Sequence, residues 1–256
     1  MRDLLAPLAD APSVTGIFCD FDGSLAPIVS DPSEARPVKG AGDALHELAK
    51  RFKLVAVVSG RPVAFLSSRL EARGVRLVGL YGIEERVGRS LRVLPEAQKA
   101  RGAILAAEQR LRTMLDPRVY IEPKGFALSI HTRRTSDPDA LFADMEPIIR
   151  GVAEEQGLHV TRGRLVWELA PAAGQQDKGD VVRRCIERNG LRRALVAGDD
   201  RGDLAAFRAL DGLEAAVRVG VESPEMPDEL RAESDLIVDG PASLIELFRE
   251  LRQLVD

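Results

Sequence analysis

The sequence predicts an α/β protein with a Rossmann-like, doubly wound parallel sheet, interrupted by a small inserted α+β domain. Short apolar runs alternate with helical patterns towards both ends of the chain, which is typical of open parallel sheets. The middle of the chain instead shows paired short strands joined by tight turns, which indicates antiparallel hairpins. At 256 residues, the chain is long enough for one large domain or two small ones.

The strands of the parallel sheet are predicted from apolar runs, because strands buried on both faces are apolar throughout. These runs lie at Val14–Cys19, Leu54–Val58, Arg76–Leu80 and Ala194–Ala197, with two further candidates around Ala215–Val219 and Leu236–Val238. Helices are predicted where apolar residues recur at helical spacing, as at Ala41, Leu45 and Leu48. A closing helix is predicted over Ser243–Leu254.

The inserted domain is predicted as two successive helix–strand–strand units. The first comprises a helix over Glu96–Leu115 and strands Val119–Glu122 and Phe126–His131, and the second a helix over Pro138–Gln156 and strands His159–Thr161 and Leu165–Leu169. We therefore expect a core formed by residues 1–86 and 174–256, and an inserted cap formed by residues 87–173.

Composition and charge exclude several classes of partner. The formal net charge is −4 with acidic and basic residues interspersed, so there is no basic stripe for nucleic acid. The two cysteines, Cys19 and Cys185, form neither a CxxC motif nor a disulfide framework, which suits a reducing cytosol. The N-terminus lacks the pattern of a signal peptide, and no apolar run is long enough to cross a membrane. We expect a cytoplasmic monomer that acts on a small molecule.

An acidic turn, DFDGS at residues 20–24, follows the first predicted strand. Ligands of open parallel sheets bind at the carboxyl ends of strands, where this turn lies. The Asp20 carboxylate can act as a nucleophile, and Asp22 can protonate a leaving oxygen and later activate water. Gly23 permits a sharp turn whose N–H groups can face a phosphate. Taken alone, the same pentapeptide is equally typical of an ordinary acidic turn.

Three further polar clusters lie at a predicted strand end or at a helix start beside one. Ser59 and Arg61 follow the second strand, where they can bind phosphate oxygens or simply begin a helix. Lys178 opens a later helix and can neutralise a carboxylate nucleophile together with a phosphate, although a single lysine is usually solvated. Asp199 and Asp203 follow another strand, and their carboxylates suit Mg²⁺, although many acidic loops are only solvated.

In this chain order, the four clusters resemble the motifs of the haloacid dehalogenase superfamily of phosphotransferases. The resemblance implies Asp20 as nucleophile and Asp22 as general acid/base, with Ser59 and Lys178 as further catalytic residues. It also implies Mg²⁺ as cofactor, with these ligands: the Asp20 carboxylate, the Asp22 carbonyl, Asp199, and Asp203 as a further or outer ligand. The insert lies between the second and third motifs, where that superfamily places one type of cap domain.

Longer stretches resemble trehalose-6-phosphate phosphatases, from about Gly16 to Phe207. The matching segments are DFDGSLAPIVSDPSEARP, VAVVSGRP, GLYGIE, EPKGFALSIHTR, VWELAP, DKGD and GDDRGDLAAF. The resemblance implies a phosphoric monoester hydrolase of trehalose biosynthesis, which converts trehalose 6-phosphate to trehalose and phosphate. The chain departs from the family pattern at five positions. Ser24 stands where Thr is usual and keeps the hydroxyl, and Gly202, Leu204, Thr132 and Ala170 replace the usual Thr, Glu, Tyr and Arg. These departures weaken the assignment of trehalose 6-phosphate as the substrate in preference to a related sugar phosphate.

We expect the substrate to be bound by groups at the core motifs and on the cap strands. They are Gly23, Ser24, Gly60, Arg61, Glu122, Lys124, His131, Arg133 and Glu168. A disaccharide presents many hydroxyls, so its site needs charged and bidentate polar groups. Alternatively, the cap residues form the solvated face of an antiparallel sheet. His131 and Arg133 could instead fix the hairpin or the junction between the domains.

Other functions remain open at this point. A phosphatase of another sugar or glycosyl phosphate would keep the same chemistry with a different substrate. A sugar phosphomutase of the same superfamily would return the phosphate to the sugar, and the sequence has no marker for or against it. A non-enzymatic phospho-acceptor domain is disfavoured, because such domains are half this length and lack an acid equivalent to Asp22.

Overall fold

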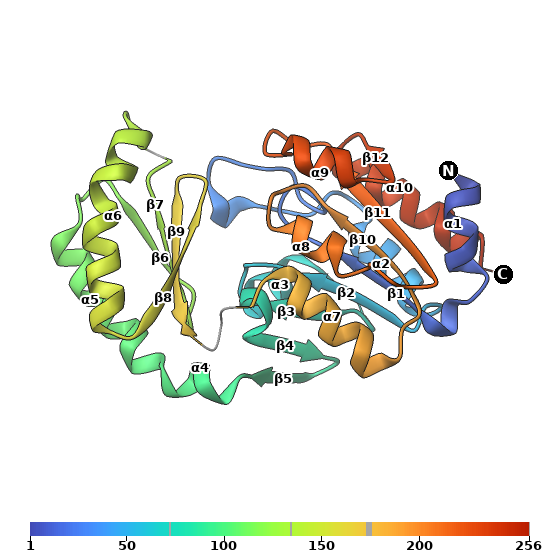
Figure 1. Cartoon of the computed structure of the whole chain (residues 1–256), viewed down its shortest axis with the longest axis horizontal. Coiled ribbons are helices and arrows are strands. Elements are labelled where there is room, and N and C mark those ends of the chain that lie inside the picture. Colours follow the sequence, from blue (N-terminus) through green and yellow to red (C-terminus); the bar gives the residue numbers. More distant parts are fainter. Residues whose placement is uncertain (72, 134, 173–175, 256) are drawn as a thin grey trace. The chain divides into compact units, whose positions relative to one another are not determined.

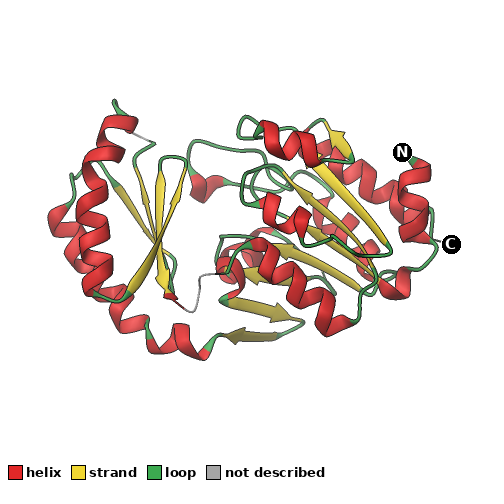
Figure 2. Ribbon diagram, in the orientation of Figure 1, coloured by secondary structure: helices red, strands yellow, loops and turns green. Residues whose placement is uncertain are grey.

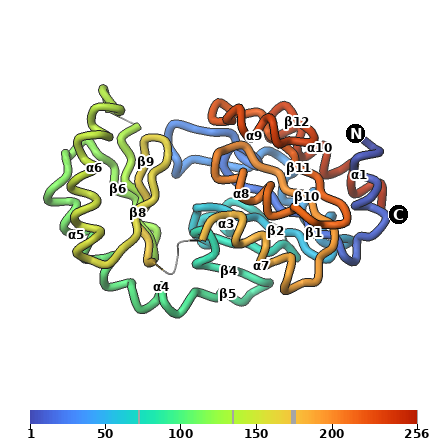
Figure 3. The backbone as a smooth tube through the Cα atoms, viewed as in Figure 1, coloured from blue at the N-terminus to red at the C-terminus, as the bar shows by residue number. Residues whose placement is uncertain are grey.

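The computed structural model describes residues 1–71, 73–133, 135–172 and 176–255. These residues group into two compact units, Met1–Arg92 with Gln176–Asp256 and Val93–Gln175. Figure 3 follows the chain from the first unit into the second and back again. Within the described ranges, no helix is both long and apolar enough to span a membrane.

The first unit is built on one mainly parallel sheet (Figure 1), and the predicted α/β fold class is confirmed. Among the described residues it has eight strands, in the order β12-β11-β10-β1-β2-β3-β4-β5. Their bounds are β1 Thr15–Cys19, β2 Leu54–Val58, β3 Arg76–Gly79, β4 Glu84–Val87, β5 Ser90–Val93, β10 Arg193–Gly198, β11 Ala215–Val221 and β12 Leu236–Val238. The six strands predicted from apolar runs are present and pair in parallel with one another.

Strands β4 and β5 were not predicted from the sequence. β4 pairs antiparallel with β3, and β5 extends the sheet beyond it. Both strands are short and carry many exposed side chains, so they lack the apolar pattern that identifies the buried strands. Because they continue the first unit's sheet, the second unit begins at Val93 rather than at residue 87.

Helices cover both faces of this sheet (Figure 2). The helices of the first unit are α1 Arg2–Ala9, α2 Ala41–Ala49, α3 Val63–Arg69, α7 Lys178–Asn189, α8 Asp203–Arg208, α9 Asp228–Glu233 and α10 Gly240–Gln253, with short 3-10 helices at Pro12–Val14, Pro32–Glu34 and Leu80–Gly82. The buried side chains of α1, α2, α3 and α10 pack together in one apolar cluster, and those of α7, α8 and α9 in another.

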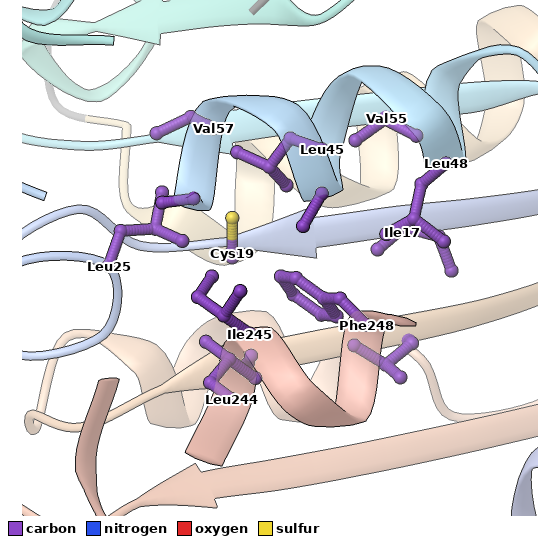
Figure 4. Packing of buried hydrophobic residues seen from close by; sticks show 14 of the residues in the cluster. Ile17, Cys19, Leu25, Leu45, Leu48, Val55, Val57, Leu244, Ile245 and Phe248 are labelled. Atoms are coloured by element: carbon purple, nitrogen blue, oxygen red, sulfur yellow. The ribbon is translucent and has the colours of Figure 1, made fainter. Parts of the chain in front are cut away.

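Strand β1 contributes to both clusters, because successive side chains of a strand point to opposite faces. Ile17 and Cys19 pack beneath α2 and α10 (Figure 4), whereas Phe18 joins the other cluster. Each fully buried side chain of this size stabilises the fold by ~1.5–3 kcal/mol. Cys19 lies beside Asp20 in the chain, but its side chain belongs to the core. This packing fixes β1 in the sheet, and with it the residues that follow the strand.

The second unit packs two long helices on one face of an antiparallel sheet. Among its described residues the sheet has four strands, in the order β6-β7-β9-β8. The elements are α4 Pro95–Lys99, α5 Arg101–Met114, β6 Tyr120–Pro123, β7 Leu128–His131, α6 Pro138–Glu155, β8 Leu158–Gly163 and β9 Val166–Pro171. The helix predicted over Glu96–Leu115 is divided into α4 and α5 at Ala100. Trp167 is fully buried and stacks on Phe142, so its predicted place in the core is confirmed.

Candidate active site

Strands β1 and β10 bring the first and last acidic clusters together. They pair in parallel with Cys19 opposite Ala197, so Asp20 and Asp199 follow both strands at the same edge of the sheet. The backbone N–H of Asp20 donates to the Ala197 carbonyl at 3.1 Å. This bond extends the hydrogen bonding between β1 and β10 as far as Asp20. Ser59 follows β2, the other neighbour of β1, and therefore lies at this edge too.

Three buried carboxylates form a cluster at this edge. Asp20, Asp199 and Asp203 each offer an oxygen, and these oxygens all lie within 4.8 Å of one another. Asp203 is the first residue of α8, and its Oδ2 accepts the backbone N–H groups of Asp199 at 3.0 Å and Asp200 at 3.1 Å. The Oδ2 atom of Asp199 is buried and has no hydrogen-bond partner among the described residues. A buried carboxylate oxygen without a hydrogen-bond donor, beside two further buried carboxylates, suits the binding of a cation.

The turn after β1 fits closely against this cluster. Gly23 has φ 79°, in the left-handed region that glycine adopts without strain. A Cβ at this position would lie 1.9 Å from Oδ2 of Asp199, so no side chain can be accommodated. The Ser24 hydroxyl donates to Oδ1 of Asp199 at 3.2 Å. The glycine and serine predicted to bind substrate therefore also hold Asp199 in place.

Lys178 links the carboxylates. Its Nζ lies 3.1 Å from Oδ2 of Asp20, 2.8 Å from Oδ1 of Asp203 and 3.5 Å from Oδ1 of Asp200. The lysine is the first residue of α7, whose start is fixed by a reciprocal capping box between Asp177 and Asp180. With 4% of its surface exposed, Lys178 is not the solvated lysine of the alternative interpretation.

The protonation of this site is governed by burial and by crowded negative charge. Burial, with the neighbouring carboxylates, raises the pKa of Asp20 to about 8, although Lys178 opposes the shift. Burial and the carboxylates of Asp203 and Asp200 likewise raise the pKa of Asp199 to about 8. Burial opposes the charged form of Lys178, but the surrounding carboxylates hold its pKa well above the usual range. The single positive charge of Lys178 therefore does not balance the negative charge of the carboxylates. The remaining negative charge favours the binding of a cation.

Asp22 lies in a separate ion pair with Arg61. The guanidinium donates from Nε to Oδ2 of Asp22 at 2.7 Å and from Nη2 to Oδ1 at 2.9 Å, a bidentate arrangement. Arg61 also lies over the ring of Phe65, with 4.6 Å between Cζ and the ring centroid. Its backbone N–H donates to the Ser59 hydroxyl at 3.2 Å. Arg61 of the second motif thus fixes the Asp22 carboxylate of the first motif.

In the second unit, four of the predicted cap residues lie on one face of the sheet. Nζ of Lys124 lies 2.7 Å from Oε1 of Glu168, which also accepts the Ser129 hydroxyl at 3.0 Å. Nε2 of His131 lies 3.1 Å from Oε2 of Glu122. The alternate residues of the same strands pack under the helices, among them Ile121, Ile130 and Trp167. The polar residues therefore occupy the face of the sheet without helices.

Arg133 lies apart from this polar group. It is exposed, and its Nη2 donates to the backbone carbonyl of Arg164 at 3.4 Å, in the turn between β8 and β9. This contact matches the alternative in which Arg133 fixes the hairpin. The rest of the predicted cap set is brought together by strand register, which places Glu122 opposite Ser129 and Ser129 opposite Glu168.

The segment GLYGIE carries contacts to the second motif that the sequence did not reveal. Oε2 of Glu84 accepts the backbone N–H of Val63 at 2.6 Å, at the start of α3. Tyr81 approaches Gly60 closely. The resemblance to a known family marked this segment, but nothing in its residue types indicated contact with residues some twenty positions away. Asp200 is one of the three carboxylates of the fourth motif that the sequence suggests for a cation, and its contact with Lys178 was not predicted.

A family model described as trehalose-phosphatase matches residues 18–235. The chain belongs to this family. It is 34% identical over 211 residues to the trehalose-phosphate phosphatase of Mycobacterium marinum (strain ATCC BAA-535 / M), over 79% of this chain and 53% of that protein. The chain spans about half the length of the curated relatives it matches.

Solved structures share the fold. A trehalose-6-phosphate phosphatase related protein superposes with a TM-score of 0.75 at 23% identity, over 93% of this chain and 97% of that one. A haloacid dehalogenase-like hydrolase from Bacteroides thetaiotaomicron gives a TM-score of 0.62 at 15% identity, over 93% of this chain and 99% of that one. The resemblance to trehalose phosphatases inferred from the motifs is confirmed, and the fold is shared with a haloacid dehalogenase-like hydrolase.

Proposed function

We propose that this chain is a Mg²⁺-dependent phosphatase that hydrolyses trehalose 6-phosphate through an aspartyl phosphate on Asp20. The observation that carries the proposal is the buried lysine at 3.1 Å from Asp20, within a cluster of carboxylates. A nucleophilic carboxylate, a fixed positive charge and a cation site in one place are the requirements of phosphoryl transfer. Membership of the trehalose-phosphatase family supports trehalose 6-phosphate as the substrate.

The residues of the cluster fit a divalent cation. Asp20, Asp199 and Asp203 would hold it, with the Asp22 backbone carbonyl as a further expected ligand. The buried and unpartnered Oδ2 of Asp199 and the raised pKa of two carboxyl groups support this assignment. When bound, Mg²⁺ would neutralise negative charge on the phosphoryl group during transfer.

In the proposed first step, a carboxylate oxygen of Asp20 attacks the phosphorus atom, and the bond between phosphorus and the sugar oxygen breaks. Asp22 donates its proton to the departing oxygen, so the sugar leaves as an alcohol. Asp20 then carries the phosphoryl group as an acyl phosphate. Lys178 balances negative charge that develops beside Asp20.

In the second step, Asp22 accepts a proton from a water molecule as the water oxygen attacks phosphorus. The bond between phosphorus and Asp20 breaks, inorganic phosphate leaves, and Asp20 is again a free carboxylate. Ser59, Gly60, Gly23 and Ser24 are proposed to bind the phosphate oxygens, because they border the same edge of the sheet.

Arg61 is proposed to serve both Asp22 and the substrate. Its guanidinium holds both oxygens of Asp22 when that group is ionised. When Asp22 carries a proton, one of these oxygens becomes a hydrogen-bond donor, and the carboxyl accepts from Arg61 more weakly because it has lost its charge. The phosphate of the substrate can then accept from the guanidinium in place of Asp22. This exchange would explain how Arg61 can pair with Asp22 and also bind the substrate, as the sequence predicts.

The sugar is proposed to be bound by Glu122, Lys124, His131 and Glu168. These side chains already hydrogen-bond to one another, so sugar hydroxyls can replace partners that are equally polar. Arg133 is proposed to support the hairpin instead. Curated relatives that match this chain include proteins described as trehalose-phosphate phosphatases.

The test is phosphate release from a panel of sugar phosphates, measured with Mg²⁺ and again after chelation. We expect trehalose 6-phosphate to be hydrolysed with the highest kcat/KM, and chelation to abolish turnover until Mg²⁺ is restored. Comparable turnover of many monosaccharide phosphates would contradict trehalose as the substrate. Activity that survives chelation would contradict the assigned role of the carboxylate cluster, and an isomerised sugar phosphate without free phosphate would indicate a mutase.

A further inference from the structure

Two successive residues after β3 adopt a backbone conformation that side chains disfavour. Leu80 has φ 49° and Tyr81 has φ 52°, both in the left-handed region. Among the residues that the structure describes, only Leu165 shares this feature without being glycine, and it lies in a cap hairpin turn. Neither Leu80 nor Tyr81 is a residue type that tolerates this region well, so the strain must be offset by contacts elsewhere.

The strained turn presses the side chain of Tyr81 against the second motif. A Cβ at Gly60 would lie 2.6 Å from Oη of Tyr81 and 2.8 Å from its Cζ. The backbone of Gly60 is not in the left-handed region. The glycine is therefore required because the phenol occupies the place of a side chain, and not because of its own φ angle.

The backbone of the same turn holds the loop from both sides of Gly60. The N–H of Tyr81 donates to the Ser59 carbonyl at 3.2 Å, and the N–H of Leu80 donates to the Arg61 carbonyl at 3.1 Å. The buried Glu84 fixes the end of the loop by accepting the Val63 N–H. The turn thus holds the loop at successive points, with the phenol ring packed at its centre.

We propose that Tyr81 is a positioning residue, whose ring packs on Gly60 and fixes the loop that carries Ser59 and Arg61. Since Arg61 holds both oxygens of Asp22, the position of the ring also sets that of the acid/base carboxylate. Tyr81 is in addition one of the groups that act electrostatically on Lys178, which places it near the reacting groups. The inference rests on the proposed phosphatase chemistry but not on the identity of the sugar.

The first experiment compares Tyr81→Phe with Tyr81→Asn. Phenylalanine keeps the ring, whereas asparagine tolerates the left-handed backbone but removes the ring. With p-nitrophenyl phosphate as substrate, we expect Tyr81→Phe to stay within about threefold of the parent. We expect Tyr81→Asn to lower kcat by ~10–100-fold, with less change in KM, because a small displacement of reacting groups is costly. Thermal melts of both variants show whether each one folds. Full kcat in a folded Tyr81→Asn variant would overturn the proposal.

The second experiment is a double-mutant cycle with Gly60→Ala. The added methyl group should collide with the ring and lower kcat strongly. In Gly60→Ala/Tyr81→Asn the ring is absent, so kcat should exceed that of Gly60→Ala alone. Losses that simply multiply would mean that the two positions act independently, and would refute the proposed contact.

Binding of orthovanadate, a phosphate-like anion, separates this inference from the proposed function. We expect the parent protein to bind orthovanadate more tightly than Tyr81→Asn, measured by calorimetry in the presence of Mg²⁺. If the parent cleaves no phosphate ester, the proposed function fails, and equal vanadate affinity in the two proteins would still overturn the inference. If the parent cleaves p-nitrophenyl phosphate but not trehalose 6-phosphate, only the assigned sugar fails.

Discussion

The carboxylates of the first unit and those of the second differ in how their charge is balanced. In the first, oxygens of Asp20, Asp199 and Asp203 converge on one another, and burial raises the pKa of each. A single ammonium group, that of Lys178, contacts Asp20 and Asp203. In the second, Glu168 pairs with Lys124 and Glu122 with His131, each acid with its own partner. The first arrangement is incomplete without a cation, whereas the second is complete and can exchange partners for sugar hydroxyls. We propose that the difference separates a site for chemistry from a surface for recognition.

The comparison is tested most severely by Asp20→Asn. An amide is not a nucleophile towards phosphorus, so we expect turnover to fall by ~10⁴-fold or more. Because the substitution removes one of several crowded carboxylates, the metal-free variant should melt no lower than the parent. Phosphate release and thermal melts provide the two measurements. Asp211→Asn, at an exposed ion pair with Arg218, is the matched control and should keep full activity.

Lys178→Met removes the single ammonium group that the carboxylates share. We expect kcat to fall by ~10³-fold, since the fixed positive charge beside Asp20 is lost. Without metal, the free energy of unfolding should also fall by ~3–5 kcal/mol, because buried charges lose their partner. Denaturant unfolding with and without Mg²⁺ measures this. A loss of activity with unchanged metal-free stability would show that the cluster is less crowded than the geometry indicates.

Glu168→Gln tests the proposal that the polar residues of the second unit recognise the sugar. The substitution weakens the pair with Lys124 but leaves the first unit unaltered. We expect the ratio of kcat/KM for trehalose 6-phosphate over p-nitrophenyl phosphate to fall by ~10–100-fold, since a buried polar contact with substrate is lost. Arg133→Ala, outside the polar group, should lower the same ratio much less. Equal effects of the two variants would remove the distinction between recognition and support.

The last prediction concerns the melting temperature as pH changes. The folded pKa of Asp20 and Asp199 is about 8, against an ordinary value of 3.8, so the native state binds more protons than the unfolded chain in this window. Metal-free stability should therefore fall as pH rises from about 4 to about 8, and then level off. Mg²⁺ replaces these protons, so it should raise Tm by ~5–10 °C at pH 8 and less at pH 5. Calorimetric scans across this range measure how Tm changes with pH. An increase in Tm by Mg²⁺ that does not depend on pH would show that the ion binds away from Asp20 and Asp199.

Much of the fold and of the first unit's site could be predicted because the relevant signals are local. The strands are continuous apolar runs, and the carboxylates of Asp20 and Asp199 follow directly after two of them. Parallel pairing then brings these residues to one edge without any further information. The β4–β5 hairpin was missed because its short, partly exposed strands carry no such pattern.

By itself, the sequence determined which residues lie at the edge of the sheet and therefore where the chemistry is proposed to occur. Only the tertiary structure decided how their side chains pair. Arg61 is 39 positions from Asp22, yet it holds both oxygens of that carboxylate. Arg133 is only two positions from His131, yet its side chain donates to the Arg164 carbonyl in the turn between β8 and β9. The physical reason is that strand ends are fixed by local hydrophobic pattern. Side-chain pairing, like the packing of Tyr81 on Gly60, depends instead on rotamers and backbone strain that only the assembled chain defines.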